Sequence, residues 1–214
     1  VNAATLCIAA IAPWTENFEG GAFPPPCWAI TPTTPLLWNN STGLAAGISG
    51  YGVGTASAWA DFWGISATTP VDLISLDFDA TGLINPTLKF DWAFDRYFTS
   101  SDQLQIHYST DAGATWVLLA RGYPDSSGTG LFNLITVDNG ITSEYGSAEN
   151  PVLATDWNTI GFGIPTGANK VKFTAVSDYG NNLFVDNIKV IQPLGNDVGT
   201  VSVDVASSIG AGVI

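Results

Sequence analysis

The sequence predicts an all-β protein. Short runs rich in Val, Ile, Phe and Thr alternate with turn residues, and no apolar repeat of 3.6 residues persists as an amphipathic helix would require. The 23 glycines and 12 prolines among 214 residues are scattered along the chain and disfavour helices. With 46% hydrophobic and only 12% charged residues, the chain is expected to fold. Its length suits one large all-β domain, or one domain plus a fragment of another.

The excess of acidic residues limits the classes of ligand that the protein can bind. Six Lys and Arg residues stand against nineteen Asp and Glu, a net charge of −13, which argues against nucleic acids and anionic membrane surfaces as ligands. The same balance is compatible with cation binding and with a secreted protein. No stretch of about 18 apolar residues exists to span a membrane. Without Met or a signal peptide, the chain is expected to be a mature piece of a longer precursor.

The N-terminal segment is apolar and irregular, and we expect residues 1–11 to be a leader or linker. Two cysteines, Cys7 and Cys27, flank the segment that contains Glu19. In an exported protein they would form a disulfide, and the alternative is two buried thiols. Glu19 is followed by Gly20 and Gly21, whose backbone carbonyls can approach a ligand. Calcium prefers several oxygens, with carbonyls joining carboxylates, so this segment suits a cation, although an ordinary strand end with a solvated Glu would look the same.

A second segment with unusual carboxylate placement follows at 57–63. In a regular strand Trp59, Asp61 and Trp63 share one face. An Asp between two tryptophans could be a third metal ligand or part of a platform on which sugars stack. Core aromatics with a hydrogen-bonded Asp are the simpler alternative.

The central part of the chain shows the strand pattern most clearly. Runs at 71–79 and 86–94 are predicted to pair with each other across a turn. The run 104–108 alternates, with Leu104, Ile106 and Tyr108 inward and Gln105 and His107 outward. A further strand is predicted at 131–137, and the segment 156–164 leads to the final hairpin.

A hairpin motif follows this alternating strand. The string Ser109-Thr-Asp-Ala-Gly-Ala-Thr-Trp matches the Asp-box. In this motif the Asp side chain caps the turn, the Gly adopts a positive φ and the Trp packs beneath. The motif is structural rather than catalytic. A sialidase propeller would repeat it in several blades, and here it occurs once.

The last hairpin, 171–191, contains the most unusual carboxylate. Read with period two, Phe184, Asp186, Ile188 and Val190 share a face, and the three apolar members predict that this face points into the core. An unpaired Asp186 there would be badly desolvated, so it is protonated, caps a backbone group or binds a cation. Our hypothesis is that Glu19 and Asp186 meet at one calcium ion between the first and last strands.

Four blocks in this order resemble a known group of domains. They are Asn17-Phe-Glu-Gly-Gly-x-Phe-Pro-Pro-Pro-Cys-Trp, Ser57-Ala-x-x-Asp-Phe, the Asp-box, and Asp178-Tyr-Gly-Asn-Asn-Leu-Phe-Val-Asp-Asn-Ile. The group comprises the MAM-like, cleaved-adhesin and choice-of-anchor domains of large secreted Bacteroidetes proteins. The resemblance implies a two-sheet antiparallel jelly-roll sandwich of the galactose-binding-like kind over 12–193. It also implies a linker and the start of an immunoglobulin-like domain over 194–214.

The resemblance further implies a structural calcium ion held by Glu19 and Asp186. From the residue patterns described above, Gly21 and Asp61 are candidate additional ligands. It implies secretion, location outside the cell or on its surface, and a role in adhesion. Neighbouring domains of the same polypeptide are then expected partners, together with a glycan or a cell-surface protein.

Catalysis is disfavoured by the residue inventory. The single histidine, His107, lies on the polar face of a strand, no nucleophile motif flanks it, and the glutamates stand in no acid/base motif. A binding module is favoured because loops hold several aromatic side chains. The candidate ligand-binding residues are Trp59, Trp63, Asp95, Arg96, Tyr97 and Phe98. The alternatives are a structural spacer of a surface filament or an accessory domain of a secreted peptidase.

Overall fold

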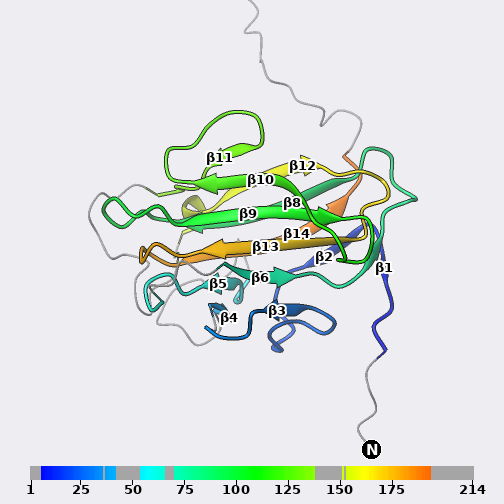
Figure 1. The fold of residues 1–214 in the computed structure, drawn as a ribbon, viewed down its shortest axis with the longest axis horizontal. Helices are drawn as coiled ribbons and strands as arrows, with labels where there is room; N and C mark the ends of the chain where they lie inside the picture. The colour runs from blue at the N-terminus through cyan, green and yellow to red at the C-terminus, as the bar shows by residue number, and fades with distance from the viewer. Residues whose placement is uncertain are drawn as a thin grey trace, which may run out of the picture.

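Two sheets packed face to face make up the protein (Figure 1). The computed structural model describes residues 6–35, 37–41, 54–65, 70–137, 151 and 153–193. The front sheet, nearer the viewer in Figure 1, consists of β11 (Leu131–Asn133), β10 (Val117–Tyr123), β9 (Gln103–Ser109), β13 (Lys170–Val176), β6 (Val71–Ile74) and β3 (Ala29–Thr31) in that order. The back sheet consists of β12 (Asn158–Gly163), β8 (Thr87–Phe94), β14 (Leu183–Ile191), β5 (Ala58–Ala60) and β4 (Trp38–Asn40), with β2 (Trp14–Glu16) also paired to β14. The predicted all-β jelly-roll sandwich is therefore confirmed.

Short elements complete the fold. β1 (Ala10–Ile11), inside the predicted leader, pairs in parallel with β7 (Phe78–Asp79). β10 and β11 also pair in parallel, whereas the other ladders are antiparallel. The turn η1 (Ala154–Asp156) is the one helical element among the described residues, and no helix in this part of the chain is long and apolar enough to cross a membrane. The predicted linker at 194–214 lies outside the described residues.

The predicted pairing of the runs 71–79 and 86–94 is wrong. β6 pairs with β13 and β3 in the front sheet, whereas β8 pairs with β14 and β12 in the back sheet. The chain leaves β6 at Ile74, passes through β7 and crosses to the other sheet before β8 begins. Strands that are neighbours in sequence are thus not neighbours in space, as happens where a connection switches sheets.

The core lies between the sheets and follows the alternation of each strand. Leu104 and Ile106 of β9 are fully buried, as predicted. The inward face of β8 carries Leu88, Phe90, Trp92 and Phe94, all buried. Phe90 meets Phe173 of the facing sheet edge-to-face, with 5.2 Å between the ring centroids, a geometry that adds about 0.5–1.5 kcal/mol beyond the buried area.

A β-bulge in β14 changes which side chains face the core. The register shifts between Asp186 and Lys189, and Asn187 adopts a φ of 50°. An extra residue inverts the alternation beyond it. Ile188 joins the core between the sheets, as does Val190, whereas Phe184 belongs to a separate cluster with Trp59 on the outer face of the back sheet. The prediction that these side chains and Asp186 share one inward face is therefore wrong.

Two other local predictions are confirmed. Cys7 and Cys27 form a disulfide, with 5.6 Å between their Cα atoms. In the Asp-box turn, the Asp111 carboxylate accepts hydrogen bonds from the Thr115 amide at 2.8 Å and the Thr115 hydroxyl at 2.6 Å, and Gly113 has a φ of 91°. These hydrogen bonds, first of all that from the Thr115 hydroxyl, lower the pKa of Asp111 to about 2.

Candidate functional site

Three connections meet at one end of the sandwich, on the left in Figure 1. They are residues 61–65 after β5, 95–102 between β8 and β9, and 177–182 between β13 and β14. Their aromatic residues Trp63, Tyr97, Phe98 and Tyr179 form a contiguous cluster, here called the aromatic tip. Trp63 stacks on Tyr179 with 6.2 Å between ring centroids and meets the edge of Tyr97 at 5.0 Å, and Tyr97 contacts Phe98 at 4.4 Å.

The outer members of the aromatic tip face solvent. Phe98 is 51% exposed and Tyr179 is 52% exposed. Both have positive φ values, 50° and 62° respectively, which are uncommon for bulky residues other than Gly. Backbone strain of this kind persists only where the surroundings impose it, and it concentrates at binding sites. Two large rings are thus held out toward solvent by strained turns.

Asp102 fixes the loop that carries Tyr179. Its buried carboxylate accepts hydrogen bonds from the backbone amides of Asp178 at 2.7 Å and Gly180 at 3.3 Å. Desolvation by burial is the main cause that raises the pKa of Asp102 to about 6, although these bonds and the Ser100 hydroxyl lower it. A Cβ on Gly180 would lie 1.9 Å from Asp102 Oδ2, so only glycine fits this turn.

Hydrogen bonds also tie the loops to one another. The backbone amide of Trp63 donates to Asn182 Oδ1 at 3.1 Å, and the Ser177 hydroxyl donates to the Ile65 carbonyl at 2.6 Å. The Ser101 amide donates to Asp178 Oδ2 at 2.9 Å. Each of the three connections is therefore bonded to the 177–182 loop or belongs to it. The aromatic tip is accordingly pre-organised, which reduces the entropy lost when a ligand binds.

The structure gathers only some of the predicted ligand-binding residues. Trp63, Tyr97 and Phe98 meet at the aromatic tip, and Arg96 beside them forms an ion pair with Asp125. Asp95 is fully buried. Trp59 lies elsewhere, buried against Phe184 and Trp157 on the outer face of the back sheet. Tyr179 was not among the predicted residues, although its position before Gly180 in a predicted hairpin indicates an exposed turn.

A buried row of polar side chains crosses the outer face of the back sheet. Asp186 of β14 lies directly opposite Asp91 of β8, which lies opposite Thr159 of β12. Asp186 is 1% exposed and Asp91 is 5% exposed. Like charges at opposed positions destabilise a sheet, and burial adds a desolvation cost. Asp186 Oδ1 accepts a hydrogen bond from the Asn187 amide at 2.6 Å, so it does cap a backbone group, one of the three predicted roles.

Glu19 reaches the same part of the back sheet. Its Oε1 accepts hydrogen bonds from the amides of Thr55 at 2.6 Å and Ala56 at 2.9 Å, while Oε2 accepts the Thr55 hydroxyl at 2.6 Å. Burial pushes the pKa of Glu19 upward, but these bonds outweigh it and leave the pKa lowered. Because Val185 pairs with Ala58, Asp186 follows directly beside the start of β5. Glu19 and Asp186 therefore approach the same short segment, 55–58.

The other candidate metal ligands are not gathered there. Asp61 lies at the far end of β5, four residues beyond Ser57, a separation of roughly 13 Å along a strand, and its Oδ1 accepts a hydrogen bond from the Gly64 amide at 2.7 Å. Burial raises the pKa of Asp61. Gly21 is exposed, with a φ of 74°. Within the described ranges, no three His, Cys, Asp or Glu side chains form a group that could hold a metal ion.

Comparison with known proteins shows likeness of fold. No protein-family model matches the chain, and no curated protein matches it in sequence. Among solved structures, the K2 cleaved adhesin domain of Lys-gingipain matches with a TM-score of 0.58 and 20% identity, covering 85% of this chain and 100% of that domain. The K1 domain from Porphyromonas gingivalis W83 matches with a TM-score of 0.55 and 18% identity, covering 85% of this chain and 98% of that one. The K3 domain matches with 0.51 and 13%, covering 84% and 98%. This chain thus has the fold of the cleaved adhesin domains.

Proposed function

We propose that this chain is a non-catalytic binding module of a secreted or cell-surface protein, and that the aromatic tip binds a glycan or a surface ligand. The observation that carries the proposal is the exposure of Phe98 and Tyr179 on loops fixed by hydrogen bonds. Aromatic rings bury a large apolar area, and a Tyr hydroxyl adds a polar contact. A rigid, partly exposed cluster of four rings is suited to packing against the apolar face of a sugar ring.

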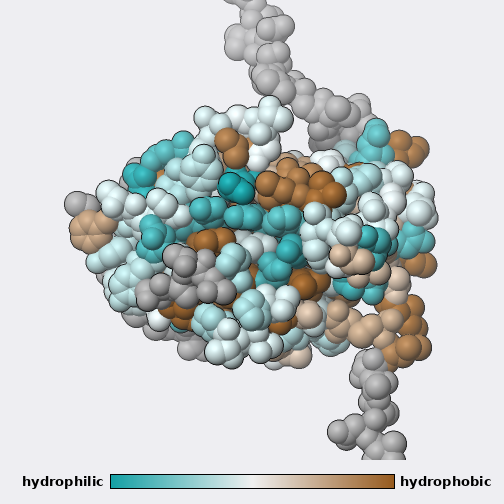
Figure 2. Space-filling model, viewed as in Figure 1, coloured by the Kyte–Doolittle hydropathy of each residue, from teal (hydrophilic) through white to brown (hydrophobic). Residues whose placement is uncertain are grey.

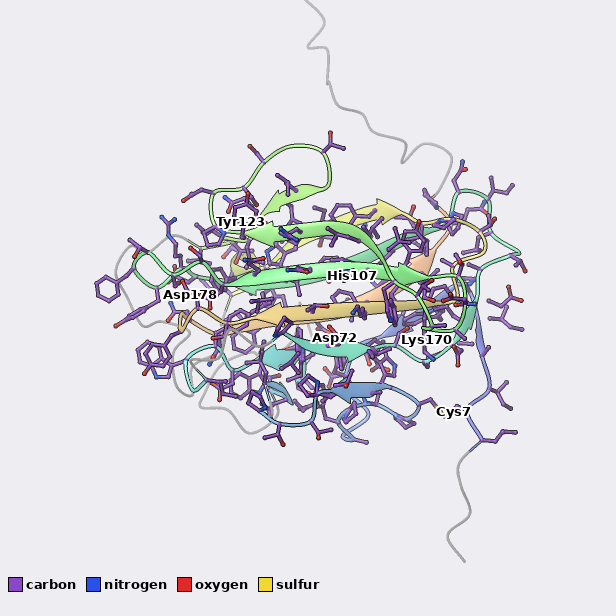
Figure 3. All side chains as sticks on the ribbon, viewed as in Figure 1. Cys7, Asp72, His107, Tyr123, Lys170 and Asp178 are labelled. Carbon is purple, nitrogen blue, oxygen red and sulfur yellow. A yellow bond between two sulfur atoms is a disulfide. The ribbon has the colours of Figure 1, made fainter. Side chains whose placement is uncertain are left out.

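The position of the aromatic tip supports its proposed role as the ligand-binding surface. Figure 3 shows Asp178, in the 177–182 loop, at the left end of the molecule and Cys7 near the right end. β14 runs from the 177–182 loop toward the right, so this last described strand also ends away from the aromatic tip (Figure 1). Cys7 and the end of β14 therefore both lie away from the aromatic tip.

The surroundings of His107 support a role without catalysis. His107 lies in register between Lys172 and Leu118, near the centre of the front sheet (Figure 3), where the visible face is largely hydrophilic (Figure 2). Desolvation, followed by the positive charge of Lys172, lowers its pKa to about 4. It is neutral at physiological pH, and neither in-register neighbour is a nucleophile. The nearby carboxylate of Asp72 accepts hydrogen bonds from Lys172 Nζ at 2.8 Å and the Thr174 hydroxyl at 2.5 Å.

We further propose that one calcium ion stabilises the back sheet, with Glu19 and Asp186 as ligands. The opposed, buried carboxylates of Asp186 and Asp91 support this proposal, because a divalent cation would offset their repulsion. The hydroxyls of Ser41 and Ser57, which are buried nearby and 3.0 Å apart, add oxygens of the type that calcium prefers. Glu19, which hydrogen bonds to residues 55 and 56 hold beside Ser57, would supply the second carboxylate ligand.

A glycan array tests the binding proposal. Phe98→Asn and Tyr179→Asn remove each ring and place at its positive φ a residue that tolerates this conformation well, so folding is preserved. Leu118→Ala, which trims a similarly exposed side chain on the front sheet, is the control. We expect wild type and control to bind the same glycans, and both Asn variants to lose most of the signal. Unchanged binding by the Asn variants would place the ligand elsewhere, and a blank array with folded protein would favour the spacer or peptidase-accessory role.

A further inference from the structure

A second candidate site lies at the opposite end of the back sheet from the aromatic tip. The outer face here contains a groove with a volume of about 960 Å³, which is in the range of small-molecule sites. It is formed by the outer faces of β8 and β12, the segment before β8, and the residues at the end of β14. Its polar lining includes Asn85, Thr87, Lys89, Thr159 and Gln192.

Gly163 of β12 keeps part of the groove floor open, whereas a Cβ on Gly161 would lie 3.1 Å from Thr87 Cγ2. A Cβ built on Gly163 meets no atom within 4 Å, so the space above this position is empty of protein. Gly161 lies directly opposite Lys89, and Gly163 lies opposite Thr87. One wall is fixed by a hydrogen bond from the Ile84 amide to Gln192 Oε1 at 2.8 Å. The floor is therefore bare backbone between a lysine and an apolar rim.

One lysine, Lys89, lines the groove, and a second, Lys189, lies opposite it on the neighbouring strand. Lys89 of β8 pairs in register with Lys189 of β14, and together they account for two of the six Lys and Arg residues. Arg96, Lys170 and Lys172 each form an ion pair with an Asp. In the described part of the chain, neither Lys89 nor Lys189 forms one. Opposed like charges destabilise a sheet. A protein of net charge −13 has more than enough carboxylates to pair with both lysines, yet among the described residues neither lysine is paired with one.

We propose that the groove binds a short acidic oligosaccharide. Its oxyanion, a carboxylate or a sulfate, would lie between the Lys89 and Lys189 ammonium groups, where charge-assisted hydrogen bonds are strong. Its ring would lie over Gly163. The Thr87 and Thr159 hydroxyls, which donate to the Asn85 carbonyl and to Asp91, could accept hydrogen bonds from sugar hydroxyls. Gln192 Nε2 could donate one. A short ligand is favoured because the negative charge of the whole protein repels a long polyanion. This site is separate from the aromatic tip and does not depend on it.

Calorimetric titration tests the proposal with three trisaccharides, a uronic acid trimer, a sulfated galactose trimer and neutral galactotriose. We expect one of the two acidic trimers to bind, which identifies the oxyanion, and galactotriose to bind at least about tenfold more weakly. Lys89→Gln should weaken the acidic trimer by about tenfold or more. Lys170→Gln, which makes the same charge change on the front sheet, should leave binding unchanged.

A second pair of variants keeps the test independent of folding and of the aromatic tip. Gly163→Val fills the groove at a strand position where a side chain meets nothing, so it should abolish binding without lowering the melting temperature. Tyr179→Asn should leave binding of the acidic trimer intact. The proposal is overturned if neither acidic trimer binds, if the neutral trimer binds equally well, or if Tyr179→Asn rather than Gly163→Val removes binding.

Discussion

Replacing Asp102 with Asn should stabilise the protein at neutral pH. The folded-state pKa of Asp102 is raised from 3.8 to about 6, chiefly by burial. The stability associated with this group is therefore fully present below pH 3.8 and is lost as the pH rises through 6. The difference between these pKa values corresponds to ~3 kcal/mol. Asn resembles the protonated carboxyl group, because its carbonyl oxygen can still accept the Asp178 and Gly180 amides.

His107 makes the opposite contribution over much of the same pH range. Its folded-state pKa is lowered from 6.5 to about 4 by burial and by Lys172. The stability associated with a neutral His107 is present above pH 6.5 and is lost as the pH falls through 4. Between pH 4 and 6.5 the two groups offset each other, so the wild-type melting curve alone reveals neither. The difference between wild type and Asp102→Asn isolates the carboxyl group.

Thermal melting by circular dichroism at pH 3.5 and pH 7.5 makes this comparison. We expect equal melting temperatures at pH 3.5. At pH 7.5, the variant should be more stable by up to about 3 kcal/mol, which raises the melting temperature by roughly 5–10 °C for a domain of this size. A variant that is less stable than wild type by the same amount at both pH values would refute the reasoning, because the ionised carboxylate would then not be the destabilised form.

Two further predictions concern the supports of the fold. Gly180→Ala places a methyl group against Asp102 Oδ2 and Ser100 Oγ, at 1.9 Å and 2.5 Å. It should lower the free energy of unfolding by about 1–3 kcal/mol, measured by denaturant titration. A denaturant midpoint equal to that of wild type would mean that the loop can open at no cost. The double variant Cys7→Ser/Cys27→Ser removes the disulfide and should cost ~3 kcal/mol, and calorimetry showing no loss would mean that the N-terminal segment is held by other contacts.

Local patterns in the sequence predicted the all-β class and several details of the fold, whereas the jelly-roll sandwich was inferred from the resemblance of four sequence blocks. The alternation of Leu104 and Ile106 fixed the inward face of β9, and the Asp-box spacing fixed the capping role of Asp111. The disulfide between Cys7 and Cys27 was also anticipated. These features depend on residues close together in the chain or on chemistry that a residue type imposes, which a single sequence reveals.

Features that depend on distant contacts were not predictable. Nothing local marks the bulge at Asn187, yet because of it Ile188 and Val190 face the core while Asp186 lies on the outer face. β6 pairs with β13, about a hundred residues further along, rather than with β8. The opposition of Lys89 and Lys189 likewise joins positions a hundred residues apart. Trp63 was identified as a candidate, but its stacking on Tyr179 becomes apparent only when the loops are placed in space.

Thermal melting in calcium and in chelator tests most directly whether a cation joins Glu19 and Asp186. At a calcium concentration one hundred times the dissociation constant, a filled site contributes about 2.7 kcal/mol, or roughly 5–10 °C. We expect wild type to melt higher in calcium than in chelator by this margin, and Asp186→Asn to melt at one temperature in both. Identical wild-type melting in calcium and in chelator would contradict the calcium site.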